Sequence, residues 1–352
     1  MRYTLFLILF FSTTAFSQSS KIDSVIKRIP LKRDTIQSIF EWVAHNIDYD
    51  VEKSQSMSIR SVPFFLHQSN EEKINGTLLT KKGVCEDYAL IFNSICQKLG
   101  YQSYVVEGYT KDITKIETDA GHAWNVVKIK EKWYCFDPTW AAGGVSQNIF
   151  HKDYNDIWFK VPPNEFIFTH VPYDPIWQLT EHPVIAKTNN INLPISGYFN
   201  FEDSISTYKD TKSIEFFQKL INRIVKYSDS NDNVTQYIKF LTDNLNVEKY
   251  NFGIEKLNHA VTVYNSYLFA KNNKFQNPKL SDSEIQDLLG TIKKDIDESQ
   301  IIFGSVDYRN FKKEKKAVQE INEMNENLEK EVLFFQKYKK KKSLFRKFLY
   351  GN

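Results

Sequence analysis

The segment Gly83-Val84-Cys85-Glu86-Asp87-Tyr88-Ala89 places a cysteine where a tight turn passes into a helix. Gly83 permits a turn that exposes the sulfur. Apolar residues then recur along one side of residues 84–100, and this spacing predicts a helix that ends at Gly100. The unpaired N–H groups and the dipole of a helix N-terminus stabilise a thiolate. Cys85 is therefore a candidate nucleophile, although a cysteine in this position, taken alone, is more often an inert core residue.

A predicted β-hairpin supplies two further candidates, His122 and Asp137. His122 begins one strand-like segment and Asp137 ends the next, with only a short link around residues 130–131. A two-residue loop places His122 one diagonal step from Asp137, and a four-residue loop places them directly opposite. Both registers keep the two side chains on one face, because side chains alternate with a period of two. The carboxylate would then fix the imidazole tautomer and leave the other nitrogen to take a proton from Cys85.

The first half of the chain mixes helix and strand around these motifs. Asp34 can cap a helix over residues 34–47, whose apolar residues follow a 3.6-residue spacing. The helix over 84–100 follows, and then strand-like segments over 102–109, 122–129 and 132–137. Helices followed by a run of strands indicate an α+β fold.

The order of these motifs resembles the transglutaminase-like superfamily of papain-type folds, over about residues 34–184. The resemblance rests on Trp42-Val43, Asn46-Ile47-Asp48-Tyr49-Asp50, the cysteine motif, His122-Ala123-Trp124-Asn125 and Asp137-Pro138-Thr139-Trp140. A later stretch looks like the branch that includes kyphoscoliosis peptidase and fungal cytokinesis proteins; it contains Trp158-Phe159, Pro163-Asn164-Glu165-Phe166-Ile167, His170-Val171-Pro172 and Trp177-Gln178-Leu179. The resemblance implies a core in which the cysteine-bearing helix packs on an antiparallel sheet.

The resemblance also implies a catalytic triad. On the matching positions Cys85 is the nucleophile, His122 the general base and acid, and Asp137 the residue that orients His122. Active members attack a carbonyl with a thiolate and form an acyl-enzyme, which water hydrolyses or an amine accepts. We therefore expect a cysteine peptidase or a transglutaminase-type acyltransferase that acts on amide bonds of peptides or proteins. The alternative is a non-catalytic protein- or peptide-binding module that retains the triad.

An oxyanion hole beside Cys85 would need two hydrogen-bond donors. The backbone N–H of Cys85 is one expected donor of an oxyanion hole. The resemblance implies a second donor upstream, for which Gln68 and Asn75 are candidates, although both also fit solvated loop positions.

Cys96 and Cys135 are predicted core thiols, and Cys135 is expected to pack against the same helix as Cys96. A Cys96–Cys135 disulfide is the alternative in an oxidising compartment.

The second half of the chain has a different composition. All six Trp and all three Cys precede residue 178, and His259 is the only histidine after residue 182. Chemistry that needs Cys or His is therefore expected in the first half. This shift predicts a domain boundary near residues 185–200. The resemblance implies that the part before it, residues 18–187, is a transglutaminase-like domain, and residues 188–352 are expected to form a mostly helical C-terminal domain. Helical spacing of apolar residues is found over 213–227, 233–247, 281–297 and 311–340.

Residues 1–17 have the pattern of a secretory signal peptide. Arg2 supplies the positive start, an unbroken apolar run covers residues 5–11, and Ala15 and Ser17 are small residues at the −3 and −1 positions of a cleavage site. We expect the protein to be exported, to the periplasm or out of the cell. The alternative is a buried N-terminal strand or an uncleaved anchor.

The resemblance implies a peptide or protein substrate, and the charge of the chain excludes one other class of partner. The net charge of +3 is too close to balance for a general nucleic-acid binder. Residues 337–347, the basic tail, hold seven positive charges and no acid. This tail predicts contact with an anionic envelope surface or, alternatively, a solvated helix end whose charge suits the helix dipole. The histidines lack ligand spacing, so neither a metal nor another cofactor is expected.

Overall fold

The computed structural model describes residues 21–341, except for 31, 33, 60–68, 112–117, 187–191, 195–199, 207, 209–212, 229–230 and 308–313, and it also describes residues 346 and 349. The predicted signal peptide lies outside the described residues. Contacts divide the chain into two compact units. The first unit runs to Tyr208 and includes Arg223–Tyr237; the second comprises Lys209–Asn222 and the residues from Ile238 onward.

The helices of the first unit begin at residues that cap them. Asp34 accepts a hydrogen bond from the backbone N–H of Gln37 (3.1 Å) and caps its helix as predicted. Ser69 and Glu72 form a reciprocal capping box at a later helix. The helices are α1 (Lys21–Ile26), α2 (Thr35–Asn46), α3 (Val51–Ile59), α4 (Asn70–Thr80) and α5 (Cys85–Lys98). The two helices predicted for this part of the chain correspond to α2 and α5.

A four-stranded antiparallel sheet with the order β5-β4-β3-β8 lies at the centre of the first unit. In β4–β5, Ile129 pairs with Lys132, which leaves a two-residue loop and selects the diagonal register for His122 and Asp137. Lys130 adopts the positive φ of 56° that such a tight loop requires. The strands are β3 (Gln102–Lys111), β4 (Thr118–Ile129), β5 (Lys132–Phe136) and β8 (His170–Pro172). The first three are the predicted strands, and β8 extends the sheet beyond β3.

Shorter strand pairs complete the first unit. Strand β1 (Asp48–Tyr49) pairs in parallel with β2 (Lys82–Gly83), just before α5. Strand β6 (Gly143–Ser146) pairs with β7 (Ile149–Lys152), and β9 (Val184–Ala186) pairs with β10 (Asn192–Pro194). The β1–β2 pair positions the turn from which the cysteine-bearing helix starts.

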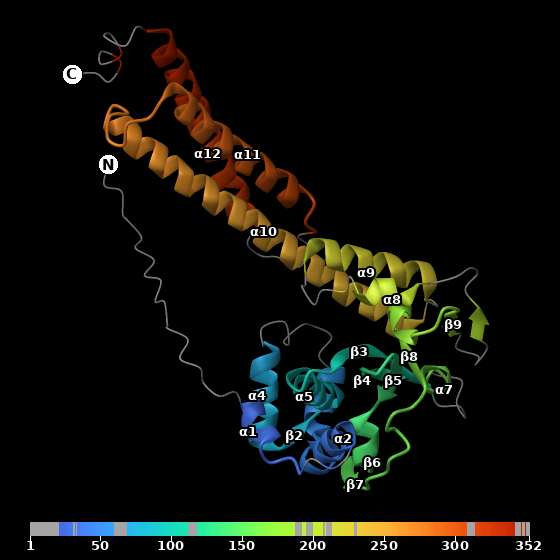
Figure 1. Cartoon of the computed structure of the whole chain (residues 1–352). Coiled ribbons are helices and arrows are strands. Elements are labelled where there is room, and N and C mark those ends of the chain that lie inside the picture. The colour runs from blue at the N-terminus through green and yellow to red at the C-terminus, as the bar shows by residue number, and fades with distance from the viewer. Residues whose placement is uncertain are drawn as a thin grey trace. The chain divides into compact units, whose positions relative to one another are not determined.

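Apolar layers cover both faces of the four-stranded sheet. Alternate residues of β4 and β5 point to opposite faces. Val127 and Phe136 pack in a cluster with α1, α2, α4 and α5, which Figure 1 shows grouped beside the sheet. Trp124 and Cys135 pack in a separate cluster on the other face. That face is covered by α7 (Pro163–Phe166), the 3-10 helix η2 (Pro175–Gln178) and α8 (Phe201–Ser206). The first unit is therefore an α+β fold with helices on both sides of its sheet.

This layering corrects a prediction about the cysteines. The expectation that Cys135 packs against the same helix as Cys96 is wrong, because Cys96 belongs to the cluster around α5 and Cys135 to the opposite one. Strand alternation shows which residues share a face, but it does not show which layer covers that face. Cys85, Cys96 and Cys135 are all free, so the alternative of a disulfide is not borne out. Cys96 and Cys135 are buried thiols, as predicted, and burial raises the pKa of both.

The second half of the chain is helical, as its apolar spacing predicts. Helix α10 runs well past the predicted end at residue 247. A Cβ at Gly253, inside α10, would lie 2.9 Å from the ring of Phe303, so glycine here permits close helix packing and does not end the helix. The helices are α9 (Ile214–Tyr227), α10 (Asp232–Asn272), α11 (Asp282–Gly304) and α12 (Glu314–Lys340). Figure 1 shows α10, α11 and α12 side by side, and they share one apolar core.

The segment 223–237 packs with the first unit although it lies in the helical half of the sequence. Arg223 pairs with buried Asp174, with a shortest N···O distance of 2.6 Å. Tyr237 stacks on Tyr173, with ring centroids 4.0 Å apart. The boundary predicted after residue 187 follows composition, and packing carries the first unit beyond it. In the described part of the chain, every helix is too short or too polar to cross a membrane.

Candidate active site

Cys85 is the first residue of α5 because the preceding turn is fixed on both sides. The backbone N–H of Val84 donates to Asp87 Oδ2 (2.8 Å), so the Asp87 carboxylate caps the helix. Asp87 is buried and also binds Lys53 Nζ (2.6 Å). A Cβ at Gly83 would lie 2.7 Å from the Cβ of Asp87, so only glycine lets this carboxylate fold back. Cys85 is partly exposed, unlike the two other cysteines.

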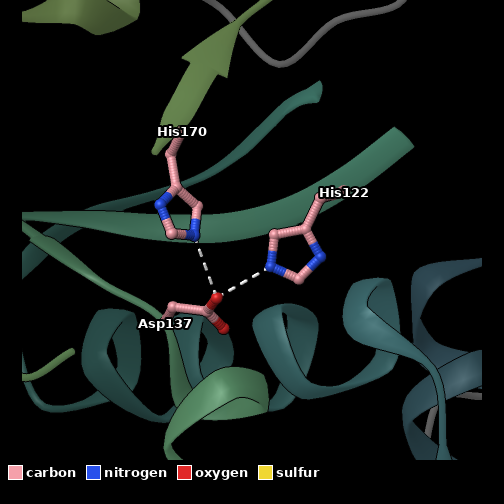
Figure 2. Close-up of side chains that lie close together, drawn as sticks. All are labelled: His122, Asp137 and His170. Atoms are coloured by element: carbon pink, nitrogen blue, oxygen red, sulfur yellow. Dashed lines mark hydrogen bonds and ion pairs between the residues drawn. The ribbon is translucent and has the colours of Figure 1, made fainter. Parts of the chain in front are cut away.

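His122 and Asp137 meet as the hairpin predicts. Nε2 of His122 lies 2.7 Å from Oδ2 of Asp137, and Figure 2 shows the imidazole edge directed at the carboxylate. Asp137 also caps α6 (Pro138–Ala142), because its Oδ1 accepts the backbone N–H groups of Thr139 (2.9 Å) and Trp140 (3.1 Å). One oxygen is therefore held by a helix start, and the other is available to imidazole.

The charges of this pair are set by the contacts of each group. Burial opposes the positive charge of His122, but the charge and hydrogen bond of Asp137 outweigh it, and together with Cys85 they raise the pKa of His122 to about 10. Burial likewise opposes the charge of Asp137, yet His122 and a second histidine hold the pKa of this carboxyl well below its ordinary range. At neutral pH the pair is an imidazolium and a carboxylate.

The second ring nitrogen of His122 is available to Cys85. Since Nε2 is bound to Asp137, Nδ1 is the nitrogen available to a thiol, and a side-chain hydrogen bond with Cys85 contributes to the raised pKa of His122. The structure thus brings Cys85, His122 and Asp137 together, in the relative order that the sequence predicts. Their catalytic roles remain predictions.

The structure adds a residue that the sequence reasoning missed, His170 of β8. Its Nε2 lies 3.2 Å from Oδ2 of Asp137, and its Nδ1 lies 2.8 Å from Oγ1 of Thr169. Figure 2 shows His122 and His170 approaching the same carboxylate from two strands. Burial lowers the pKa of His170 to about 4, so this imidazole is neutral. The sequence carried one signal, the segment His170-Val171-Pro172 within the family resemblance, but its spacing does not point to Asp137.

Strand pairing explains how His170 reaches the site. Gly108 of β3 pairs with His122 on one side and with Pro172 of β8 on the other. A Cβ at Gly108 would lie 2.2 Å from the carbonyl oxygen of Val171 and 2.4 Å from the ring of Trp124. Glycine therefore allows β8 to approach β3 closely enough to bring His170 over Asp137.

The side chains of His122, Asp137 and His170 also form a group that could hold a metal ion, because one ligand atom of each lies within 4.8 Å of the others. The hydrogen bonds described above already use these ligand atoms. A cation here would have to displace both Nε2 protons, so the arrangement fits a hydrogen-bonded cluster better. The absence of a resident metal stays a prediction.

The oxyanion-hole candidates are partly placed. Among the described hydrogen bonds, the backbone N–H of Cys85 has no acceptor, so it is available to a developing negative charge. Asn75 lies in α4, and its described contact is a hydrogen bond from Lys21 Nζ to its carbonyl oxygen (3.2 Å). Gln68 lies outside the described residues. Tyr49, which belongs to the Asn46–Asp50 motif, is a further neighbour. Burial raises its pKa, a hydrogen bond with Ser54 opposes the shift, and interactions with Cys85 and Asp137 raise the pKa further, so its hydroxyl stays protonated.

The first half of the chain is similar in sequence to proteins of one known family. Residues 19–152 match a family model described as a transglutaminase-like domain. Kyphoscoliosis peptidase of Mus musculus is 28% identical over 188 residues, which are 51% of this chain and 27% of that protein. Cytokinesis protein 3 of Schizosaccharomyces pombe is 33% identical over 99 residues, 27% of this chain and 11% of that protein. The chain thus matches about a quarter of the peptidase and less of the cytokinesis protein.

One solved structure that the chain matches is the crystal structure of a TGase. It is 18% identical, the match covers 42% of this chain and 39% of that chain, and the TM-score is 0.28.

Proposed function

Because the first half of this chain belongs to the transglutaminase-like superfamily, in the branch that includes kyphoscoliosis peptidase, we propose that it is a cysteine enzyme acting on amide bonds of peptides or proteins. The observation that carries this proposal is the 2.7 Å bond from His122 Nε2 to Asp137, which leaves Nδ1 for Cys85 at the start of α5. This is the relation of nucleophile, base and orienting group that acyl transfer requires.

The proposed reaction proceeds through an acyl-enzyme. The Cys85 thiolate attacks the carbonyl carbon of an amide, and the oxygen of the tetrahedral intermediate accepts the Cys85 backbone N–H. His122 gives its Nδ1 proton to the leaving amine as the C–N bond breaks, which leaves a thioester on Cys85. Neutral His122 then takes a proton from water or from an amine as that nucleophile attacks the thioester. The products are a carboxylic acid or a new amide, and Cys85 is regenerated.

Electrostatics favours a resting state that is ready to react. With the pKa of His122 raised to about 10 by Asp137 and Cys85, the imidazolium persists through the physiological range. A positive charge beside the sulfur stabilises the thiolate, which is the nucleophilic form. The α5 N-terminus adds to this stabilisation.

A second candidate function is a protein- or peptide-binding module that retains the triad. It is favoured by the second unit, whose helices expose large apolar side chains, among them Phe269, Ile301 and Leu333. A Cys85→Ala variant separates the two candidates: a module keeps its full biological activity, and an enzyme loses it.

Two further proposals concern export of the protein and the partner of its basic tail. Export follows from the pattern of residues 1–17, and it predicts a mature N-terminus at Gln18, which N-terminal sequencing of the secreted protein would detect. Contact of the basic tail with an anionic surface predicts salt-sensitive binding to anionic vesicles. Arg346 pairs with Asp282 (2.7 Å), so part of this charge already has a partner within the chain.

The rate of alkylation by iodoacetamide at neutral pH tests the enzyme proposal. Cys85 is expected to react faster than free cysteine, and Cys96 and Cys135, which are buried, serve as internal references. His122→Ala should remove the excess reactivity, whereas His182→Ala, at an exposed histidine, should not. Cys85 reacting no faster than free cysteine, with no effect of His122→Ala, would overturn the proposal.

A further inference from the structure

We infer that His170 is a positioning residue, a permanently neutral imidazole whose Nε2–H holds the Asp137 carboxylate in the orientation that His122 needs. The inference rests on the proposed function, because it assigns a role within the same site. His170 does not touch the sulfur in any described contact, so it acts through Asp137.

Aromatic rings surround His170 and keep water away from it. The ring stacks on Phe166, with centroids 3.9 Å apart and an interplanar angle of 21°. Three indole rings close the other sides, with centroid distances of 4.6 Å to Trp140 and 5.2 Å to both Trp124 and Trp158. The side chain is 0% exposed. A second positive charge beside the His122 imidazolium would be repelled and unsolvated, so the neutral form is favoured.

The hydrogen bonds decide which nitrogen of His170 carries the proton. Asp137 Oδ2 is a carboxylate oxygen and accepts only, so a bare Nε2 at 3.2 Å would repel it. Nε2 must therefore carry the hydrogen, and Nδ1 must accept one. The Thr169 hydroxyl, 2.8 Å from Nδ1, supplies that hydrogen. The Thr169 contact with the carbonyl oxygen of Phe166 is longer, at 3.3 Å, and is the weaker alternative for the hydroxyl.

His170 completes a set of four donors around Asp137. Oδ1 accepts the backbone N–H groups of Thr139 and Trp140, and Oδ2 accepts Nε2 of both His122 and His170. A carboxylate bound on both oxygens cannot rotate about its bond to Cβ without breaking several of these bonds. His122 therefore meets an acceptor of fixed direction, which holds its Nδ1 toward Cys85.

Nitrogen NMR of the unmodified chain with labelled histidine tests the protonation state without any enzymatic readout. The His170 resonances, assigned by their loss in His170→Gln, should show protonated Nε2 and bare Nδ1. They should stay unchanged from about pH 5.5 to about pH 9, across the ordinary titration of histidine. A His170 that titrates in this range, or that carries its proton on Nδ1, overturns the inference whether or not the protein is an enzyme.

Matched variants test the positioning role. His170→Gln keeps an amide N–H near the place of Nε2, and His170→Phe keeps an aromatic ring but removes the donor. We expect His170→Phe to slow Cys85 alkylation by about tenfold or more, and His170→Gln to stay within about threefold of the native rate. Equal rates in the native chain and His170→Phe overturn the inference. A native rate that is itself no faster than free cysteine, and insensitive to His122→Ala, overturns the proposed function instead.

Discussion

Replacing Arg223 by Met should destabilise the first unit far more than the loss of a surface ion pair would. Arg223 binds both carboxylate oxygens of Asp174 through Nε (3.0 and 3.2 Å) and Nη2 (2.6 Å), and Asp174 is buried. Burial raises the pKa of Asp174 although Arg223 opposes the shift, so the pair only partly offsets the desolvation of the carboxylate. Without Arg223, the same carboxylate would be buried and unpaired.

The expected cost follows from that arrangement. Removing one partner of a buried ion pair costs about 3–5 kcal/mol, because the remaining charge is uncompensated. For a urea m-value of about 3 kcal/mol/M, the midpoint would fall by roughly 1–1.7 M. Adding Asp174→Asn to Arg223→Met should recover most of the loss, because an amide tolerates burial better and retains the acceptor for the backbone N–H of Ile176 (3.4 Å).

Tryptophan fluorescence is the appropriate assay. All six Trp precede residue 178, so their emission during urea unfolding reports on the first unit of the intact chain. Lys219→Met is the matched control in the same helix, because the Lys219–Glu215 pair is exposed and its loss should change the midpoint little. Equal midpoints for Arg223→Met and Lys219→Met would refute the reasoning that segment 223–237 is built into the first unit.

Three further outcomes are expected. As the pH falls below about 6.5, His170 takes up a proton in the unfolded chain but stays neutral in the folded chain down to about pH 4. The free energy of unfolding should therefore fall by about 3 kcal/mol as the pH is lowered from about 6.5 to about 4, which urea unfolding at a series of pH values would measure. A pH profile identical to that of His170→Gln would contradict this expectation. Gly108→Ala should lower the free energy of unfolding by about 1–3 kcal/mol, because its Cβ meets the backbone of Val171. Gly76→Ala, with open space around it, should leave that free energy equal or higher, and the reverse order would contradict the close approach of β8. Asp137→Asn should slow Cys85 alkylation by about 100-fold or more, and an unchanged rate would show that the carboxylate does not orient the base.

The parts of the site that lie close in sequence could be predicted, because local geometry decides them. The two-residue link at 130–131 and the alternation of strands place His122 and Asp137 on one face in either register. The helix start at Cys85 follows from the turn that Gly83 permits and from the apolar spacing of the residues after it. Both depend on contacts within a few residues or across one tight turn.

The parts that depend on distant pairing could not be predicted in the same way. His170 reaches Asp137 only because β8 lies beside β3, and that pairing depends on Gly108 far earlier in the chain. The packing of residues 223–237 with the rest of the first unit depends on buried Asp174, whose partner Arg223 lies in α9, in the helical half of the sequence. Helical spacing shows which face of a helix is buried, but it does not identify the surface that buries it.

The pH dependence of Cys85 alkylation tests the central claim most directly. An imidazolium maintained up to about pH 10 beside the sulfur predicts that Cys85 is alkylated faster in the native chain than in His122→Ala at every pH from about 6 to about 9. His182→Ala, at an exposed histidine, should match the native chain. Equal rates in the native chain and His122→Ala across this range would contradict the account.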